Sequence, residues 1–385
     1  MSIKNLTVLH LVNSFVGKKG NIGVRTSKLV QFGEGVAIKS VVVCRGKDKT
    51  CDLPNIFTMG VFGHAARALN AFRIYVYNSF DHRTLDLFLF EVFVLFWIKF
   101  KLKRFAVDVI HLWDFSPRII RSAHRKGIKV ILDVAIVPQS YTKKMHLQNK
   151  ALFLDFSTRH HLQERLALEL SDWIIAPSDF VKSEIVSEGI EEKKIEVIPF
   201  GSDTPLCTRD FDASDEGLHY AFVGLVNNRK GIDDLLRVWD SPEFNNDKLH
   251  LCGRVYPQIK ELVNKYGFKN VVFAGHINPF EYLLGCDVFV FPTWMEGSAK
   301  AVYEALAIGL PVITTPCAGS VVEDGKDGFI IPPGGGELLR EKMLFFKDNK
   351  ESLKIMALNA MNTGANYTWE RYARLVSDRY REWNS

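Results

Sequence analysis

The sequence predicts an α/β protein of two doubly wound domains, each a parallel sheet covered by helices. Segments with strand composition alternate with helical segments along the chain, which is the pattern of such domains. The length of 385 residues exceeds what one hydrophobic core normally organises. A stretch at 199–217 is rich in Pro, Asp, Ser and Gly and lacks periodicity, so it marks a domain boundary. We place the first domain at residues 1–203.

The expected strands are short apolar runs rich in β-branched residues, which is typical of buried parallel strands. In the first domain they fall at 6–12, 37–44, 107–112, 129–134, 173–176 and 195–198. In the second domain they fall at 219–223, 248–252, 270–274, 288–292 and 311–314, each followed by a turn and a helix. Because the carboxyl ends of parallel strands share one edge of a sheet, ligands are expected at the turns that follow these strands.

Composition indicates the class of protein and its compartment. Hydrophobic residues make up 47% and charged residues 24% of the chain, as in folded soluble proteins. Six cysteines occur without a C-x-x-C pair, so neither structural zinc nor a disulfide framework is indicated. The N-terminal segment has one Lys and a short apolar run, which favours a first strand over a secretory signal. We therefore expect a cytoplasmic protein.

Charge is divided unevenly between the two predicted domains. Residues 1–203 contain 29 Lys and Arg against 20 Asp and Glu, whereas the remainder contains 20 against 24. A basic first domain is typical of proteins with an anionic partner, such as a membrane surface, a lipid diphosphate or nucleic acid. Lysines that are merely solvated would produce the same balance.

One aromatic segment bears on the membrane alternative. Residues 85–100, LDLFLFEVFVLFWIKF, contain six aromatic side chains and run directly into Lys101, Lys103 and Arg104. The segment is too short, and too interrupted by acidic residues, for a transmembrane helix. A helix in the interface of an anionic bilayer and a core helix of the first domain are the two alternatives. We prefer the first, with residues 85–104 at the inner face of the membrane.

The strand at 288–292 is followed by the most informative turn of the chain. Glu296, Gly297, Ser298 and Ala299 lie between this strand and a helix expected from Lys300 to residue 309. Backbone N–H groups and the helix dipole attract an anion there, and the small residues allow a phosphate to approach. The helix is apolar around almost its whole circumference, apart from Lys300 and Glu304. Those two side chains form either an i,i+4 ion pair toward solvent or a polar edge that meets a ligand.

Residues 296–316 read EGSAKAVYEALAIGLPVITTP. This segment resembles the E-x(7)-E block of retaining glycosyltransferases of family 4, the glycosyl transferases group 1. That resemblance implies the GT-B fold, in which two Rossmann-like domains face a central cleft. It also implies that Glu304 holds the ribose of a nucleotide-sugar donor and that Glu296 lies near the transferred sugar. Residues 171–203 and 367–383 resemble the family's domain junction and closing helix. The implied second domain is 204–365, and 366–385 packs back on the first domain.

Further donor-binding residues follow from the same resemblance. Breaking a sugar–phosphate bond leaves negative charge on a diphosphate, which requires fixed positive charge. Arg229 and Lys230 are the candidates, although a surface pair opposite Asp233 and Asp234 is the alternative. The resemblance also places a donor-binding group of residues at the turns after other strands, namely Gly224, Arg254, His276, Ile277 and, in the first domain, Gly23.

Three features depart from the family pattern. Leu225 stands where many relatives have Arg, Trp113 replaces a His, and Ala135 occupies the place of another His. These departures imply a different acceptor or reduced activity. Asp210 and Asp212 have the D-x-D form of a metal site but lie in the linker, so we interpret them as coincidence.

The resulting hypothesis is a retaining, metal-independent glycosyltransferase without a cofactor. It uses a nucleotide diphosphate sugar of UDP or GDP type and a glycan or lipid-linked acceptor, and no nucleic acid is expected. One alternative is a catalytically impaired binding subunit at the membrane, and another is a nucleic-acid-binding or modifying protein that uses the basic half. The donor base, the sugar, the linkage, the acceptor and the oligomeric state are left open.

Overall fold

The chain divides into two units, each built on its own parallel sheet. The structure, a computed structural model, describes residues 6–17, 21–49, 51–60, 63, 83–149, 152, 157–207 and 217–384. Unit 1 contains residues 1–143, 155–198 and 369–385, and unit 2 contains residues 144–154 and 199–368. The D-x-D pair Asp210 and Asp212 lies outside the described residues.

The sheet of unit 1 has seven strands. They are β1 (Leu6–Val16), β2 (Ile38–Lys47), β3 (Ile56–Thr58), β4 (Val109–Leu112), β5 (Lys129–Asp133), β6 (Trp173–Ala176) and β7 (Ile195–Val197). Their spatial order is β3-β2-β1-β4-β5-β6-β7, and every pairing is parallel. Because the chain first builds outward from β1 to β3 and then returns to β4, the order reverses between β1 and β4. Such a reversal is where open parallel sheets have their ligand crevice.

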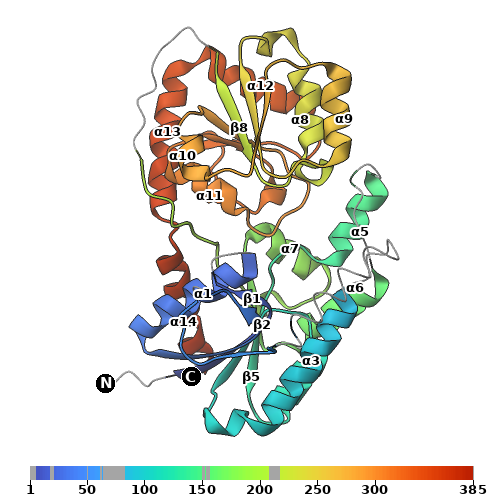
Figure 1. The fold of residues 1–385 in the computed structure, drawn as a ribbon, viewed down its shortest axis with the longest axis vertical. Coiled ribbons are helices and arrows are strands. Elements are labelled where there is room, and N and C mark those ends of the chain that lie inside the picture. Colours follow the sequence, from blue (N-terminus) through green and yellow to red (C-terminus); the bar gives the residue numbers. More distant parts are fainter. Residues whose placement is uncertain are drawn as a thin grey trace. The chain divides into compact units, whose positions relative to one another are not determined.

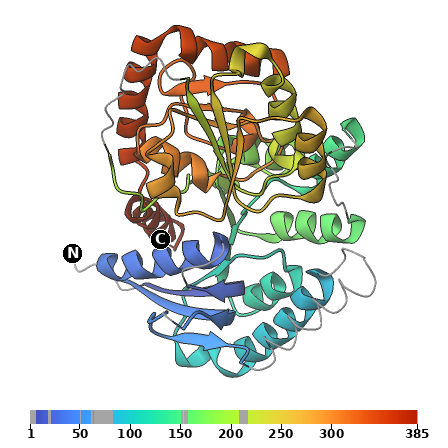
Figure 2. The same ribbon diagram turned by 45° about the horizontal axis from the view of Figure 1, so that its top comes forward.

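Helices cover both faces of this sheet. They are α1 (Asn21–Gly33), α3 (Arg83–Phe100), α4 (Pro117–His124), α6 (Thr158–Leu170), α7 (Asp179–Ser187) and the C-terminal α14 (Trp369–Asn384), with α5 (Gln139–Gln148) following β5. Helix α14 packs beside α1, whereas α3 packs on α4 and α4 on α6 (Figures 1 and 2). Since crossovers between parallel strands are almost always right-handed, connections on the two sides of the reversal are expected on opposite faces of the sheet. The final helix thus completes unit 1, although most of its sequence neighbours belong to unit 2.

Unit 2 repeats this architecture with six strands. They are β8 (His219–Val223), β9 (Lys248–Cys252), β10 (Val271–Gly275), β11 (Val288–Phe291), β12 (Val312–Thr314) and β13 (Gly328–Ile330). The helices are α8 (Ile232–Trp239), α9 (Pro257–Tyr266), α10 (Pro279–Leu283), α11 (Lys300–Ala307), α12 (Gly336–Asp348) and α13 (Lys350–Ala365). The parallel order β10-β9-β8-β11-β12-β13 reverses between β8 and β11. This reversal is the predicted position of a ligand site in unit 2.

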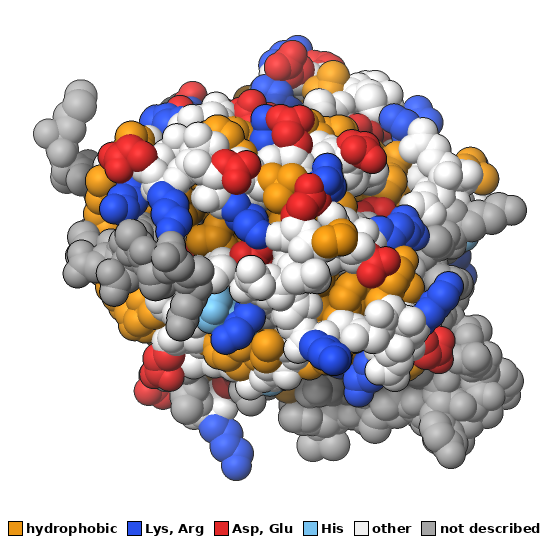
Figure 3. Space-filling view, turned by 90° about the horizontal axis from the view of Figure 1, so that it is seen from above, with side chains coloured by type: hydrophobic (Ala, Val, Ile, Leu, Met, Phe, Trp, Pro, Cys, Tyr) orange, Lys and Arg blue, Asp and Glu red, His pale blue; other side chains and the backbone are white. Residues whose placement is uncertain are grey.

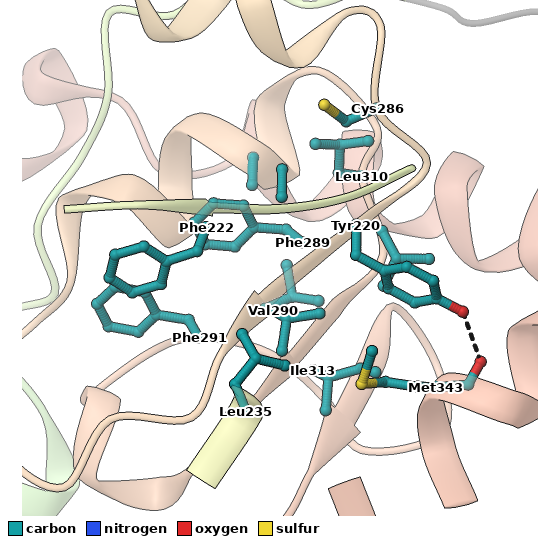
Figure 4. Close-up of a cluster of buried hydrophobic side chains, with 14 of the residues drawn as sticks. Tyr220, Phe222, Leu235, Cys286, Phe289, Val290, Phe291, Leu310, Ile313 and Met343 are labelled. Atoms are coloured by element: carbon teal, nitrogen blue, oxygen red, sulfur yellow. Dashed lines mark hydrogen bonds between the residues drawn. The ribbon is translucent and has the colours of Figure 1, made fainter. Parts of the chain in front are cut away.

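The core of unit 2 lies on both faces of β8 and β11. Phe222 and Phe291 stack at 5.4 Å between ring centroids, and Phe289 continues the row (Figure 4). Tyr220 is fully buried, and its hydroxyl donates a 2.8 Å hydrogen bond to the backbone oxygen of Met343. Strands buried on both faces explain why these segments are continuous apolar runs rather than alternating ones.

The fold class predicted from the sequence is confirmed, since both units are parallel sheets between helical layers. Two strands escaped prediction. Both β3 and β13 are three residues long and form sheet edges. The predicted helix after residue 299 is α11, which starts at Lys300 as expected.

Candidate active site

The predicted cationic pair and Glu296 meet at the strand reversal of unit 2. The short helix η5 (Asn228–Lys230) follows β8, and Glu296 follows the neighbouring β11. The Nη1 atom of Arg229 lies 2.9 Å from Oε1 of Glu296, and Nζ of Lys230 donates to the same oxygen. Two cations thus converge on one carboxylate, and the three side chains together carry a net charge of +1. Asp233 and Asp234 pair with Arg237 instead. Among the described ion pairs, Arg229 and Lys230 therefore do not form the alternative surface pair with these two acids.

Local sequence explains why η5 lies against the end of β11. The side chain of Asn227 accepts the N–H of Lys230 at 3.2 Å and so caps this turn. Gly231 has a φ of +72°, and a Cβ there would stand 2.0 Å from the backbone oxygen of Pro292. Only glycine permits that approach. The carbonyl oxygen of Arg229 then accepts the N–H of Trp294 at 3.0 Å, which holds both cations beside Glu296. Sequence reasoning did not identify Asn227 and Gly231, although the pattern N-N-R-K-G is itself a turn signal.

Ion pairing, rather than burial, keeps the side chains of Glu296, Arg229 and Lys230 charged. Lys230 is only 7% exposed, and its Nζ lies 4.8 Å from the centroid of the Phe291 ring. Burial lowers the pKa of Lys230, while the charge of Glu296 opposes that effect. Burial also acts to raise the pKa of Glu296, but the charges and hydrogen bonds of Lys230 and Arg229 outweigh it and hold the pKa below its usual value. Glu296 is therefore ionised near neutrality. An excess of one positive charge in a poorly solvated place favours an anionic ligand.

Glu304 and Lys300 form the i,i+4 ion pair that the sequence allowed. Nζ of Lys300 lies 2.5 Å from Oε1 of Glu304, near the start of α11. The two side chains differ in solvation, since Lys300 is 51% exposed and Glu304 only 13%. Glu304 is consequently not on a solvated strip. Its carboxylate is held largely out of water, and a carboxylate can accept two hydrogen bonds from a vicinal diol.

The small residues between Glu296 and Lys300 brace the turn against the segment after β12. The N–H of Glu296 donates to the carbonyl oxygen of Cys317 at 2.9 Å, and that of Ala299 to Ala318 at 3.0 Å. The buried Ser298 hydroxyl lies 2.7 Å from the hydroxyl of Tyr303. The N–H of Ala299 and the hydroxyl of Ser298 are thus already hydrogen-bonded within unit 2. The approach of a phosphate over these small residues stays a prediction, and Arg229 and Lys230 supply positive charge beside the turn.

The other predicted binding residues of unit 2 lie along the same edge of the sheet. Gly224 follows β8, Arg254 follows β9, and His276 and Ile277 follow β10. Because β9 and β8 stand between β10 and β11, the ends of β10 and β11 lie roughly 15 Å apart, three strand spacings along the edge. Arg254 and His276 are exposed and Ile277 is half-buried. An elongated ligand lying along the edge would span them.

Gly23 belongs to unit 1 and has a packing role there. It lies in the first turn of α1, and a Cβ at this position would stand 2.0 Å from the backbone oxygen of Phe15. The glycine therefore allows α1 to begin directly against the end of β1. Its contribution to donor binding stays a prediction.

Unit 1 contains a buried polar cluster that sequence reasoning missed. Asp133, at the end of β5, accepts hydrogen bonds from Nη2 of Arg25 at 2.6 and 2.8 Å, and Tyr372 of α14 donates to it at 3.3 Å. His111 of β4 contacts Tyr380 of the same helix through Nδ1. Burial acts to raise the pKa of Asp133, but Arg25 above all holds it below the usual value. Members of this cluster are up to 347 positions apart in the sequence, so no local sequence pattern predicts the cluster.

Comparison with known proteins agrees with this architecture. The family model described as Glycosyltransferase Family 4 matches residues 41–205, and the one described as Glycosyl transferases group 1 matches residues 218–349. The capsular polysaccharide biosynthesis glycosyltransferase CapM of Staphylococcus aureus is 29% identical over 48% of this chain, and the match spans 54% of CapM. The lipopolysaccharide core biosynthesis mannosyltransferase LpsB of Rhizobium meliloti is 28% identical over 71% of this chain and 83% of LpsB.

A solved structure extends the likeness to the whole chain. Anabaena HepE, determined in complex with UDP, aligns with a TM-score of 0.69 over 98% of this chain and 100% of its own, at 15% identity. At that identity the likeness concerns the fold alone. Together the two family models account for most of the residues, and both name the same group of enzymes. The chain therefore belongs to glycosyltransferase family 4, the glycosyl transferases group 1, and has the GT-B type of fold with two Rossmann-like units.

Proposed function

We propose that this protein transfers a sugar from a nucleotide diphosphate sugar to a glycan or lipid-linked acceptor, in the synthesis of a cell-surface polysaccharide or glycolipid. The observation that carries the proposal is the convergence of Arg229 and Lys230 on Glu296 at the strand reversal of unit 2. A donor diphosphate carries more than one negative charge, whereas Glu296 offsets only one of the two cations. The remaining positive charge favours the diphosphate, and more strongly as the leaving group gains charge.

The proposed reaction retains the configuration of the sugar. The bond between the anomeric carbon and the diphosphate oxygen breaks, and the acceptor oxygen forms a bond to that carbon on the same face. The acceptor proton passes to the departing diphosphate oxygen. In this scheme Arg229 and Lys230 stabilise the diphosphate without a metal ion. Glu304 accepts hydrogen bonds from the ribose hydroxyls, and Glu296 orients the cations next to the sugar.

The relatives support the coarser parts of this scheme. HepE has been solved with UDP, which supports a nucleotide donor. CapM and LpsB are named for capsular polysaccharide and lipopolysaccharide core synthesis, which supports an acceptor of the cell surface. LpsB is a mannosyltransferase, so a hexose is the sugar we propose.

Thermal melting with a panel of nucleotides tests the proposal. UDP, GDP and ADP are each added to the protein, and one of them should raise the melting temperature through mass action. Nucleotide sugars that carry these same nucleotides and a labelled sugar are then incubated with the protein. Release of the labelled sugar reports hydrolysis, and its appearance on an acceptor reports transfer. If no nucleotide raises the melting temperature, the donor site assignment is wrong. Binding without hydrolysis or transfer to any acceptor would support the catalytically impaired subunit that Leu225 and Ala135 suggest.

A further inference from the structure

Helix α3 of unit 1 buries a charged side chain and exposes large apolar ones, which is the reverse of an ordinary surface helix. Its acidic residue Glu91 is 3% exposed, accepts a hydrogen bond from the hydroxyl of Ser116, and lies 3.6 Å from Nη1 of Arg118. Phe90 and Val94 are fully buried on the same side. Burying a carboxylate is costly unless it is bonded in this way. The contacts with Ser116 and Arg118 therefore define which side of α3 faces the unit.

The opposite side of α3 presents large apolar side chains to the surface. Phe88, Val92, Phe96 and Phe100 are 46%, 50%, 64% and 58% exposed. At about 100° per residue, these positions at successive intervals of four fall within an arc of roughly 120° on the helix. The rings of Phe96 and Phe100 lie 4.5 Å apart. The apolar stripe formed by these four residues is continuous, and such a surface on a folded protein generally marks an interaction site.

Positive charge surrounds the end of the apolar stripe. Lys99, Lys101, Lys103 and Arg104 are all exposed, and residues 92–107 contain no acidic residue. At the other end of the stripe, the guanidinium of Arg118 lies 5.8 Å from the Phe88 ring centroid. Figure 3 shows one face of the molecule, on which acidic and basic side chains are interspersed. We call the apolar stripe together with Lys99, Lys101, Lys103 and Arg104 the α3 docking surface.

The chemistry of the α3 docking surface selects one kind of partner. Among the described residues no helix is long and apolar enough to cross a bilayer. Large aromatic and aliphatic side chains bordered by four cations match the boundary between acyl chains and anionic headgroups. A protein partner would have to supply both an apolar groove and a cluster of acids at matched positions. We propose that α3 lies in the interface of an anionic lipid bilayer, with Phe96 and Phe100 inserted and the four cations at the headgroups.

Flotation with lipid vesicles tests this docking. The full-length protein is mixed with vesicles of phosphatidylcholine alone or of equal parts phosphatidylcholine and phosphatidylglycerol. Wild type should float with the anionic vesicles and lose binding in molar salt, because screening removes the attraction of the cations. The double variant Phe96→Ser, Phe100→Ser should bind roughly 100-fold less, since its apolar surface no longer enters the bilayer. Replacing Lys99, Lys101, Lys103 and Arg104 by Gln should produce a loss of about the same size.

A matched control removes equal apolar exposure elsewhere. Ile355 and Leu358 on α13 are 52% and 57% exposed, and Ile355→Ser, Leu358→Ser should float as wild type does. Circular dichroism melts establish that the variants are folded. Equal flotation of wild type and the Phe96, Phe100 variant, or no flotation of wild type, would overturn the proposal. So would light scattering that shows wild type as a dimer without lipid and this variant as a monomer, because the α3 docking surface would then bind a second copy. Nucleotide binding is measured separately, so this inference and the proposed transfer can fail independently.

Discussion

Replacing Lys230 by Met isolates the contribution of the buried cation to donor binding. The substitution keeps an unbranched apolar stem over Phe291, which Nζ of Lys230 approaches at 4.8 Å, and removes only the charge. A hydrogen bond to a charged group contributes about 1.5–3 kcal/mol net. Since 1.4 kcal/mol is about a factor of ten, the dissociation constant for the nucleoside diphosphate should rise roughly 10- to 150-fold. Arg229 remains paired with Glu296 at 2.9 Å, so the turn should keep its conformation.

The thermal readout of this loss can be calculated. At a ligand concentration of about 100 times the wild-type dissociation constant, binding stabilises the protein by about 2.7 kcal/mol. If the constant rises about 100-fold, the same concentration yields only about 0.4 kcal/mol. For a unit of this size each kcal/mol corresponds to about 2–4 °C. A ligand-induced shift of roughly 5–10 °C should therefore fall to about 1–2 °C, each measured against the variant's own melting temperature without nucleotide.

Lys326→Met is the matched control, because Lys326 also pairs with a glutamate of unit 2 but is 53% exposed. Its nucleotide-induced shift should equal that of wild type. If Lys230→Met keeps the full shift, the buried cation does not contact the donor and the reasoning from the strand reversal fails.

Four further outcomes are expected. Glu296→Gln leaves both cations without a counter-charge, so nucleoside diphosphate should bind at least as tightly while the rate of sugar transfer falls, as measured by calorimetry and by labelled-donor turnover. Glu304→Ala should weaken nucleotide binding by a factor of ten or more, through loss of a charged hydrogen-bond acceptor, with little change in melting temperature without nucleotide. Gly231→Ala should cost at least about 2 kcal/mol in chemical denaturation, because it adds a clash with Pro292 to the strain of a positive φ. Glu164→Gln should flatten the pH dependence of the melting temperature between pH 5 and 8.

The pH prediction follows from burial of the Glu164 carboxyl. Burial raises the pKa of Glu164 to about 8, although a hydrogen bond from the N–H of Gln139 opposes the shift. A glutamate in the unfolded chain titrates near about 4.3, so between these values the folded state binds the additional proton. The contribution of Glu164 to the free energy of unfolding is therefore greatest below about pH 4.3. It falls by about 1.4 kcal/mol per pH unit as the pH rises toward 8. The glutamine is neutral throughout and should remove this component; identical pH profiles would contradict the assignment.

The other three predictions also have contrasting outcomes. For Gly231→Ala the control is Gly267→Ala, where φ is +70° but no atom lies within 4 Å of the added Cβ, so only the backbone strain should appear. Equal losses at both positions would show that the contact with Pro292 is not restrictive. Weaker nucleotide binding by Glu296→Gln would mean that this carboxylate supports the donor rather than balancing the cations. Unchanged binding by Glu304→Ala would place the ribose elsewhere.

Local sequence determined the elements of this protein and much of its candidate site. Buried parallel strands are short runs of β-branched and aromatic residues, so most of them were predicted to within one or two residues at their starts. The turns that follow β8 and β11 were identified by their residue types, and with them Arg229, Lys230 and Glu296. These are properties of a few consecutive residues, which a local pattern can express.

Tertiary structure alone decided which of these elements are neighbours. Strand order is set by packing between segments distant in sequence, so the adjacency of β8 and β11 and the convergence of both cations on one oxygen of Glu296 could not be deduced locally. The pairing of Arg25 with Asp133 is likewise a long-range contact. Helix α3 is apolar on all sides, and a uniform pattern carries no information about orientation. Only the buried contacts of Glu91 determine that Phe96 faces outward.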